Sequence, residues 1–404
     1  MNKNAWEYRR LGDVAVFING DRGINYPSRD EFVASGVPFI NAGHIVENKL
    51  VFDNMNYITD TKFQSLGSGK VQKGDIIFCL RGSLGKYAKI DFTGSAAIAS
   101  SLVIIRPKDE LLHDYLYHFL GSPKVLGFIE KNNNGSSQPN LSAKSVQGFQ
   151  IPFPPMGIQD NITKELNELQ NVILLKKEQL KYCDQLTQSL FYEMFGHPVH
   201  NERKWPCRRL AELCEKITNG NTPKGGSQVY VDDGIMFLRS QNVWRNKMEL
   251  DDVVYIDEST HAKLSASSVH NNDILITKTG RINTENSSLG RAALYTGEDN
   301  QANINGHVYL VRLKEGIVLH KFVLYILISD PFRELIRSVC VGGIDKRQLN
   351  RNHIEDFPIV VPPLELQQEY VTRIEVIERQ KRKINESLQV LETLQSKRLQ
   401  YWFD

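Results

Sequence analysis

The sequence predicts an α+β protein made of two strand-rich α/β domains and two long antiparallel coiled-coil helices, arranged as a pseudo-two-fold internal repeat. Three observations predict this fold class. The chain repeats itself once with a period of about 200 residues. Each copy opens with short β-type runs broken by Gly, Asn and Asp, and after a Pro-Pro pair the hydrophobic spacing changes from about 2 to about 3.5 residues. The length of 404 residues allows two to three domains.

The repeat is visible as matched segments along both copies. Trp6 and Leu11 recur as Trp205 and Leu210, and Asn19-Gly20 recurs as Asn219-Gly220. The other matched segments are 36–45 with 234–243, 74–82 with 272–280, 83–86 with 288–291, and 149–159 with 357–367. The second copy has seven extra residues before Ser288, mostly the run INTENSS, and such an insertion predicts a surface loop.

Each copy ends in a predicted helix of about 38 residues, which would rise about 57 Å at 1.5 Å per residue. Its apolar stripe runs from Ile158 to Met194 in the first copy and from Leu366 to Trp402 in the second. A stripe of this period favours a partner with the same period, and the duplicate supplies one. The short linker between the first helix and the second domain favours antiparallel pairing. Lys176 and Lys381 interrupt the stripes, which we interpret as snorkelling or register-setting side chains.

Composition excludes several classes of protein. With 41% hydrophobic and 24% charged residues the chain is typical of globular proteins, and a formal charge of +2 means that any basic surface must be local. No apolar run approaches the length of a bilayer span, and the first residues do not resemble a signal peptide. Five cysteines form no CxxC pair, which favours a reducing compartment. We therefore expect a cytoplasmic protein without a membrane partner.

Both copies have the same ordered features: the Trp and Leu start, the Gly-rich loop after an Asp-Ile-hydrophobic strand, and PPM-x-I-Q or PPL-x-L-Q opening a long helix. These ordered, duplicated features resemble the specificity subunit of type I restriction-modification systems over essentially all 404 residues. The resemblance implies target recognition domains at 1–155 and 197–362, each reading one half of a split, asymmetric DNA sequence. It implies spacer helices at 156–196 and 363–404 that set the gap between the halves.

The resemblance also implies partners for a chain that carries no catalysis and no cofactor of its own. The subunit would bind double-stranded DNA and dock onto two methyltransferase (modification) subunits that bind S-adenosylmethionine and methylate adenine. Restriction and translocase subunits driven by ATP would join through the complex. S-adenosylmethionine, ATP and Mg²⁺ are therefore expected on the partner subunits.

Candidate DNA contacts lie in loops at matching positions of the two copies. Next to Gly82 and Gly280 a backbone could approach the duplex closely, while Arg and Lys reach phosphates or base edges. The first set is Arg81, Ser83, Lys86 and Lys89 against Lys278, Thr279, Arg281, Asn283 and Arg291. A solvated basic turn is the alternative interpretation. The second set is Asn41 and His44 against Arg239, Gln241 and Asn242, for which polar capping of a strand end is the alternative.

A third set lies where the copies have diverged. Segment 131–141 is rich in amides, whereas segment 341–349 carries charges. Asn and Gln suit adenine and Arg suits guanine, so unlike half-sites are our hypothesis. The candidate contacts in these segments are Asn133, Gln138, Lys346 and Arg347.

Enzyme and metal sites are poorly supported. Gly67 to Lys70 resembles the end of a phosphate-binding loop, but Gln64 stands where its first Gly should be. Glu47-x-Lys49 has no convincing acidic partner for a nuclease. The spacing of His197, His200, Cys207 and Cys214 matches no standard zinc site. No Asn-Pro-Pro-aromatic or Asp-Pro-Pro-aromatic methyltransferase motif is present. The remaining alternative is a coiled-coil scaffold that binds proteins instead of DNA.

Overall fold

The computed structural model describes residues 6–132, 139–282, 284, 287–343 and 345–404. Contacts divide the chain into a first unit, Met1–Glu178 with Ile384–Asp404, and a second unit, Gln179–Lys383. Each unit therefore contains one strand-rich part and a stretch of both long helices, α6 (Met156–Phe195) and α12 (Leu364–Phe403). Because this division cuts through both helices, the predicted boundaries between recognition domains and spacer helices stay a prediction.

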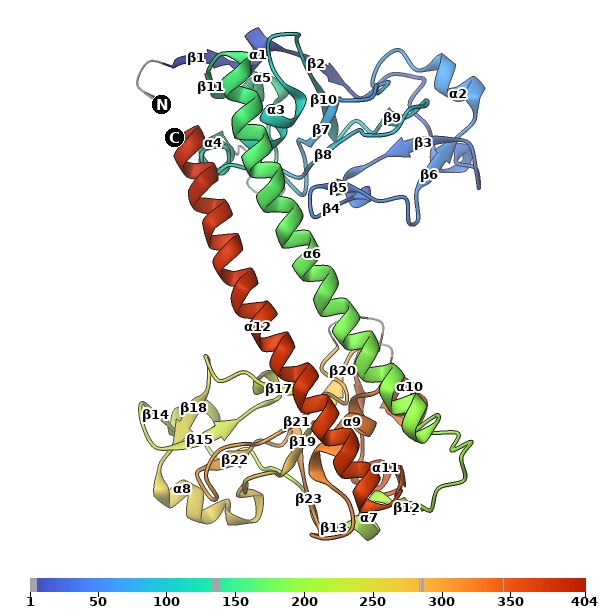
Figure 1. Ribbon diagram of the computed structural model, residues 1–404, viewed down its shortest axis with the longest axis vertical. Coiled ribbons are helices and arrows are strands. Elements are labelled where there is room, and N and C mark those ends of the chain that lie inside the picture. Colours follow the sequence, from blue (N-terminus) through green and yellow to red (C-terminus); the bar gives the residue numbers. More distant parts are fainter. Residues whose placement is uncertain (1–5, 133–138, 283, 285–286, 344) are drawn as a thin grey trace. The chain divides into compact units, whose positions relative to one another are not determined.

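The first unit is built on a four-stranded antiparallel sheet in the order β2-β10-β7-β8 and a three-stranded sheet in the order β6-β3-β9 (Figure 1). Two small sheets, β1-β11 and β4-β5, complete it. Its strands are β1 (Glu7–Arg10), β2 (Ala15–Asn19), β3 (Val37–Ile40), β4 (Ile45–Val46), β5 (Lys49–Leu50), β6 (Asn56–Ile58), β7 (Ile76–Cys79), β8 (Tyr87–Lys89), β9 (Ala97–Ile98), β10 (Leu102–Pro107) and β11 (Gln150–Phe153). Its shorter helices are α1 (Leu11–Val14), α2 (Asp60–Ser65), α3 (His113–Leu120), α4 (Pro123–Asn132) and α5 (Ala143–Gln147).

The second unit repeats this plan, with sheets β13-β23-β19-β21, β14-β18-β15-β22, β12-β26 and β16-β17. An additional sheet has the order β20-β25-β24. Its strands are β12 (Cys207–Arg209), β13 (Cys214–Asn219), β14 (Tyr230–Val231), β15 (Ile235–Leu238), β16 (Val243–Trp244), β17 (Lys247–Met248), β18 (Val254–Ile256), β19 (Ile274–Thr277), β20 (Thr279–Gly280), β21 (Ala292–Leu294), β22 (Ala302–Ile304), β23 (Val308–Leu313), β24 (Val341–Gly342), β25 (Arg347–Gln348) and β26 (Pro358–Val360). Its shorter helices are α7 (Leu210–Leu213), α8 (Glu258–Lys263), α9 (His320–Ile328), α10 (Asp330–Val339) and α11 (Arg351–Glu355). The matching strand orders confirm the predicted internal repeat.

The central strand β7 is buried along its whole length because its sheet is covered on both faces. Ile76 and Phe78 face a core shared with α3, α4 and α5, whereas Ile77 and Cys79 face a core shared with β3 and β9. Burial on both faces explains why this strand is a continuous apolar run in the sequence and not an alternating one. The equivalent strand β19 is buried in the same way.

The two long helices run antiparallel within each unit, as predicted. In the first unit, Glu165 of α6 forms an ion pair with Arg398 of α12, and Lys177 of α6 lies 3.0 Å from Glu392. The helical contacts of the second unit include an ion pair between Asp184 and Lys381, which agrees with a register-setting role for the lysine. Among the described residues, no helix is both long enough and apolar enough to span a bilayer.

The glutamine of each PPM-x-I-Q or PPL-x-L-Q motif anchors a long helix to its unit. Gln159 and Gln367 are both fully buried. The Gln367 amide accepts a hydrogen bond from the backbone N–H of Leu319 at 2.9 Å and donates to the carbonyl of Pro362 at 2.8 Å. Gln159 makes the equivalent bonds with Leu112 and Pro154. The motif thus joins the start of each helix to the segment that leads into α3 or α9.

Replacing Gln367 with leucine is expected to destabilise the second unit by about 2–4 kcal/mol, because the N–H of Leu319 and the carbonyl of Pro362 would stay buried without partners. Urea unfolding checks this value. The matched control is Gln368→Leu, an exposed neighbour on the same helix, which should change stability little. Equal effects of the two substitutions would contradict the anchoring role.

The stability of the first unit is expected to fall as the pH drops below about 6.5, the ordinary pKa of histidine. His118 is buried and its Nε2 lies 2.7 Å from Oδ1 of Asn167. Burial lowers the pKa of His118, with Asn167 opposing the shift. On acidification the unfolded chain therefore binds the proton before the folded chain does, and unfolding is favoured. Thermal melts from pH 7.5 to 5 should show this loss, and His118→Gln should reduce its slope.

Candidate nucleic-acid interface

In the first unit, two segments predicted to contact DNA lie side by side. Arg81 pairs with Asn140 in an isolated antiparallel bridge. The N–H of Gly82 donates to the carbonyl of Pro139 at 3.1 Å, and the N–H of Leu141 donates to the carbonyl of Leu80 at 2.9 Å. The loop after β7 and the divergent segment near 140 therefore form one surface.

The second unit builds the same junction as a small sheet. Strand β25 lies between β20 and β24, with Thr279 opposite Gln348 and Gly280 opposite Arg347. The N–H of Leu349 donates to the carbonyl of Lys278 at 2.9 Å, which matches the bond between Leu141 and Leu80 in the first unit. Both units thus join the loop after the central strand to the segment in which the two copies have diverged.

A groove of about 330 Å³ opens along this junction in the second unit. Three predicted contacts, Thr279, Arg281 and Lys346, line it. The groove also includes side chains that the prediction omitted. These are Thr284, Ser287, Ser288 and Asp345. The seven-residue insertion predicted a surface loop in the sequence, and Thr284 and Ser287 belong to that loop. A groove with two cations, one carboxylate and several hydroxyl groups can bind both phosphates and base edges.

Glycine is required at position 280 by the protein itself. A Cβ added there would lie 2.3 Å from the backbone nitrogen of Leu289. Gly82 is different, because its φ of +76° favours glycine while the space around it is open. The expected close approach of DNA is therefore not needed to explain Gly280.

The remaining members of the first set differ in their accessibility. Arg81, Ser83 and Lys86 are exposed. Lys89 forms an ion pair with Asp114 of α3. Lys278 is half-buried, with its amine 5.7 Å from the centre of the Tyr309 ring.

Other members of the predicted sets form internal contacts. Arg291 is 8% exposed, and burial lowers its pKa. Arg347 donates to the carbonyl of Cys340 at 3.2 Å. Asn133, Gln138 and Asn283 lie outside the described residues.

The second predicted set holds its own turns together. The buried ring of His44 bonds the N–H of Asn41 at 3.1 Å and lies 3.3 Å from the carbonyl of Asn54. Burial lowers the pKa of His44. In the repeat, Oδ1 of the fully buried Asn242 accepts the N–H of Arg239 at 2.9 Å. These contacts agree with the capping interpretation of His44 and Asn242.

Two acceptor groups of Asp252 hold the half-buried Arg239 and the exposed Gln241. Arg239 donates to the carbonyl of Asp252 at 2.5 Å, and Gln241 donates to the Asp252 carboxylate at 2.5 Å. Both side chains would have to leave Asp252 before they could contact bases.

The sites considered for metal or phosphate have structural contacts. His197 and His200 stack with ring centres 4.2 Å apart, and Nδ1 of His197 accepts two backbone N–H groups. In the parts of the chain that the structure describes, no three His, Cys, Asp or Glu side chains are placed to hold a metal ion. The N–H of Gly67 donates to the Asp21 carboxylate at 2.7 Å, so an internal anion already occupies that loop.

Comparison with known proteins identifies the family. A family model described as the type I restriction modification DNA specificity domain matches residues 3–182 and 202–393. The chain belongs to this family. It is a specificity subunit, and the family role is DNA sequence recognition without catalysis, in complexes with methylase and restriction subunits.

Named relatives of this specificity subunit match along most of their length. The type I restriction enzyme MjaVIII specificity subunit of Methanocaldococcus jannaschii is 21% identical over 389 residues, covering 92% of this chain and 86% of the relative. The StySPI specificity subunit of Salmonella potsdam is 21% identical over 393 residues, with coverages of 92% and 81%. The crystal structure of a type I S subunit from M. genitalium has a TM-score of 0.56 and 14% identity, covering 99% and 96% of the two chains. This last likeness shows that the fold is shared.

Proposed function

We propose that this specificity subunit binds a bipartite, asymmetric DNA sequence, with one half read by each unit, and directs methyltransferase and restriction subunits to it. One observation carries the proposal. Both units build the same junction of two loops, yet they present different side chains there. A duplicated scaffold with unlike contact residues is what two unlike half-sites require, since identical units would read a palindrome.

The groove of the second unit favours a half-site that contains guanine. Arg281 and Lys346 are exposed at its edge, and Arg or Lys can donate to O6 and N7 of guanine. In the first unit, Arg81 and Asn140 are the exposed bridge partners. Asparagine suits the paired donor and acceptor of adenine, so we propose an adenine in that half-site.

The helices support a spacer role and two equivalent docking sites for methyltransferase subunits. A helix of 40 residues rises about 60 Å, and its length would set the gap between half-sites. Each helix also leaves an apolar pair exposed at i and i+4, a spacing suited to an amphipathic partner helix. Tyr182 and Leu186 are 58% and 55% exposed, and their repeat equivalents Val390 and Leu394 are 68% and 44% exposed.

The test is a map of N6-methyladenine in the host genome with and without this gene. We expect one split, asymmetric motif with a fixed gap to lose its methylation when the gene is deleted. We place the protein in the cytoplasm, where it would have access to chromosomal DNA. S-adenosylmethionine, ATP and Mg²⁺ would bind to the partner subunits. An unchanged map, together with no salt-dependent DNA binding by the purified complex, would favour the protein-binding scaffold instead.

A further inference from the structure

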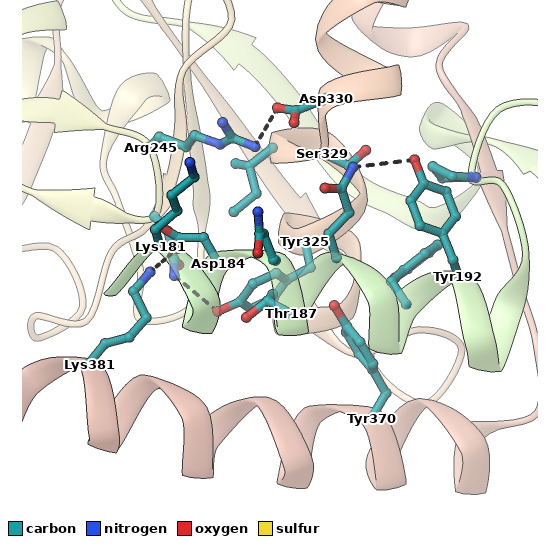
Figure 2. Close-up of a pocket in the computed structure, with 16 residues that line it drawn as sticks. Lys181, Asp184, Thr187, Tyr192, Arg245, Tyr325, Ser329, Asp330, Tyr370 and Lys381 are labelled. Atoms are coloured by element: carbon teal, nitrogen blue, oxygen red, sulfur yellow. Dashed lines mark hydrogen bonds and ion pairs between the residues drawn. The ribbon is translucent and has the colours of Figure 1, made fainter. Parts of the chain in front are cut away.

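Four arginines gather on one face of the second unit. Arg333 and Arg337 follow Asp330, the first residue of α10, at spacings that place all three on one side of the helix. Arg245 lies in the turn between β16 and β17 and forms an ion pair with Asp330 at 2.9 Å, at the border of a cavity of about 510 Å³ (Figure 2). Arg245, Arg333 and Arg337 form what we name the arginine cluster, and the buried Arg291 is their neighbour.

Arg291 connects the arginine cluster to the groove at the β20-β25 junction. Its guanidinium carbon lies 3.7 Å from the centre of the Trp244 ring. Trp244 directly precedes Arg245 in the chain. Its Nε donates to the carbonyl of Ser287 at 3.0 Å, and Ser287 lines the groove. The loop that holds Arg291 also packs on α10, because a Cβ at Gly290 would lie 2.9 Å from Ile336. The groove and the arginine cluster are thus neighbours.

The arginine cluster has an excess of positive charge. Among the described residues, the three guanidinium groups of the arginine cluster lie near the carboxylate of Asp330, which already pairs with Arg245. Burial, followed by the charges of Arg245 and Arg337, lowers the pKa of Arg333, and Asp330 opposes the shift. Like charges held together repel one another until an anion binds among them, so the surface is suited to an anionic ligand.

The first unit has no such excess at the equivalent positions. Gly85 and Ile129 make the contact that Gly290 and Ile336 make in the second unit, so Lys86 matches Arg291. By the same alignment Leu126 and Glu130 match Arg333 and Arg337. The equivalent hairpins place Glu47 at the position of Arg245. At these four positions the second unit has four arginines. The first unit has one lysine, two glutamates and one leucine there.

We propose that the arginine cluster binds the phosphate backbone of DNA next to the half-site read by the groove. The second unit would then supply sequence-independent affinity that the first unit does not match at these positions. This inference rests on the proposed function. Continuity with the groove favours DNA over an acidic protein surface, because one duplex seated in the groove would extend past Ser287 onto the arginine cluster.

The experiment measures DNA affinity of the complete complex with its methyltransferase subunits between 50 and 200 mM salt. The variant is R245Q/R333Q/R337Q, and the matched variant of the first unit is E47Q/L126Q/E130Q. Each phosphate contact contributes about 0.9 to the slope of log affinity against log salt. We expect the arginine variant to lose about 2 to 3 units of slope and to keep its preference for target over unrelated DNA.

Arg333→Lys keeps the charge and should keep the slope, which distinguishes charge from disruption of the fold. An unchanged slope in the triple arginine variant would overturn the inference, and so would a change in sequence preference. Loss of methyltransferase binding with DNA affinity of the remaining complex unchanged would mean that the surface binds protein. Failure of the unaltered complex to prefer any DNA sequence would overturn the proposed function itself, and the inference with it.

Discussion

Replacing Asp273 with alanine is expected to lower the free energy of unfolding of the second unit by about 3–5 kcal/mol. The Asp273 carboxylate is 1% exposed and accepts both Nε and a terminal nitrogen of Arg312, at 2.9 and 2.7 Å. It also accepts the backbone N–H of His270 at 2.7 Å. The substitution would leave a guanidinium that is 17% exposed without its counter-charge, between the central strands β19 and β23.

Urea unfolding gives the loss of stability, and hydrogen exchange shows where it occurs. Protection should fall most in β19 and β23 because Arg312 and Asp273 join these strands. The control is Asp251→Ala, an exposed aspartate of the same unit. Asp75 pairs with Arg106 at 2.7 Å in the first unit, so Asp75→Ala should produce the same loss there. A loss below about 1 kcal/mol in both variants would mean that the pairs are no better than surface ion pairs.

The architecture could be predicted because its signals are long and repeated. Two stretches of 40 residues with one apolar period gave helices α6 and α12, and a second copy of each segment made the repeat visible. Antiparallel pairing followed from the short linker. The small sheet at the groove carried no such signal, since β20, β24 and β25 have two residues each and a period cannot be recognised in two residues.

The roles of individual polar residues depended on partners far away in the sequence. Lys89 and Arg291 looked like basic loop residues, yet Asp114 and Trp244 hold them. The motif that ends in Gln367 was recognised as a repeat, but its hydrogen bond to Leu319, 48 residues earlier, could not be inferred from spacing. Arg281 was easier to place, because it is exposed in the loop after the central strand and needs no distant partner. It lines the groove of the second unit.

Substituting both cations of the groove, Arg281→Gln with Lys346→Gln, is expected to weaken binding of the target DNA by about 2–6 kcal/mol in total, at about 1–3 kcal/mol for each base-edge contact. Both side chains line the groove and are exposed, so their loss should not disturb the core. Because they belong to one unit, only one half of the split sequence should become degenerate in a methylation map, while the other half and the gap stay fixed.

The pattern of loss distinguishes base readout from charge alone. If Arg281 and Lys346 touch only phosphates, affinity would fall equally for target and unrelated DNA and the methylated motif would keep its sequence. Lys263→Gln, an exposed cation on α8 of the same unit, controls for charge and should leave both affinity and motif unchanged. Degeneracy in both halves at once would contradict the assignment of one half-site to each unit, since substitutions in the groove alter the second unit alone.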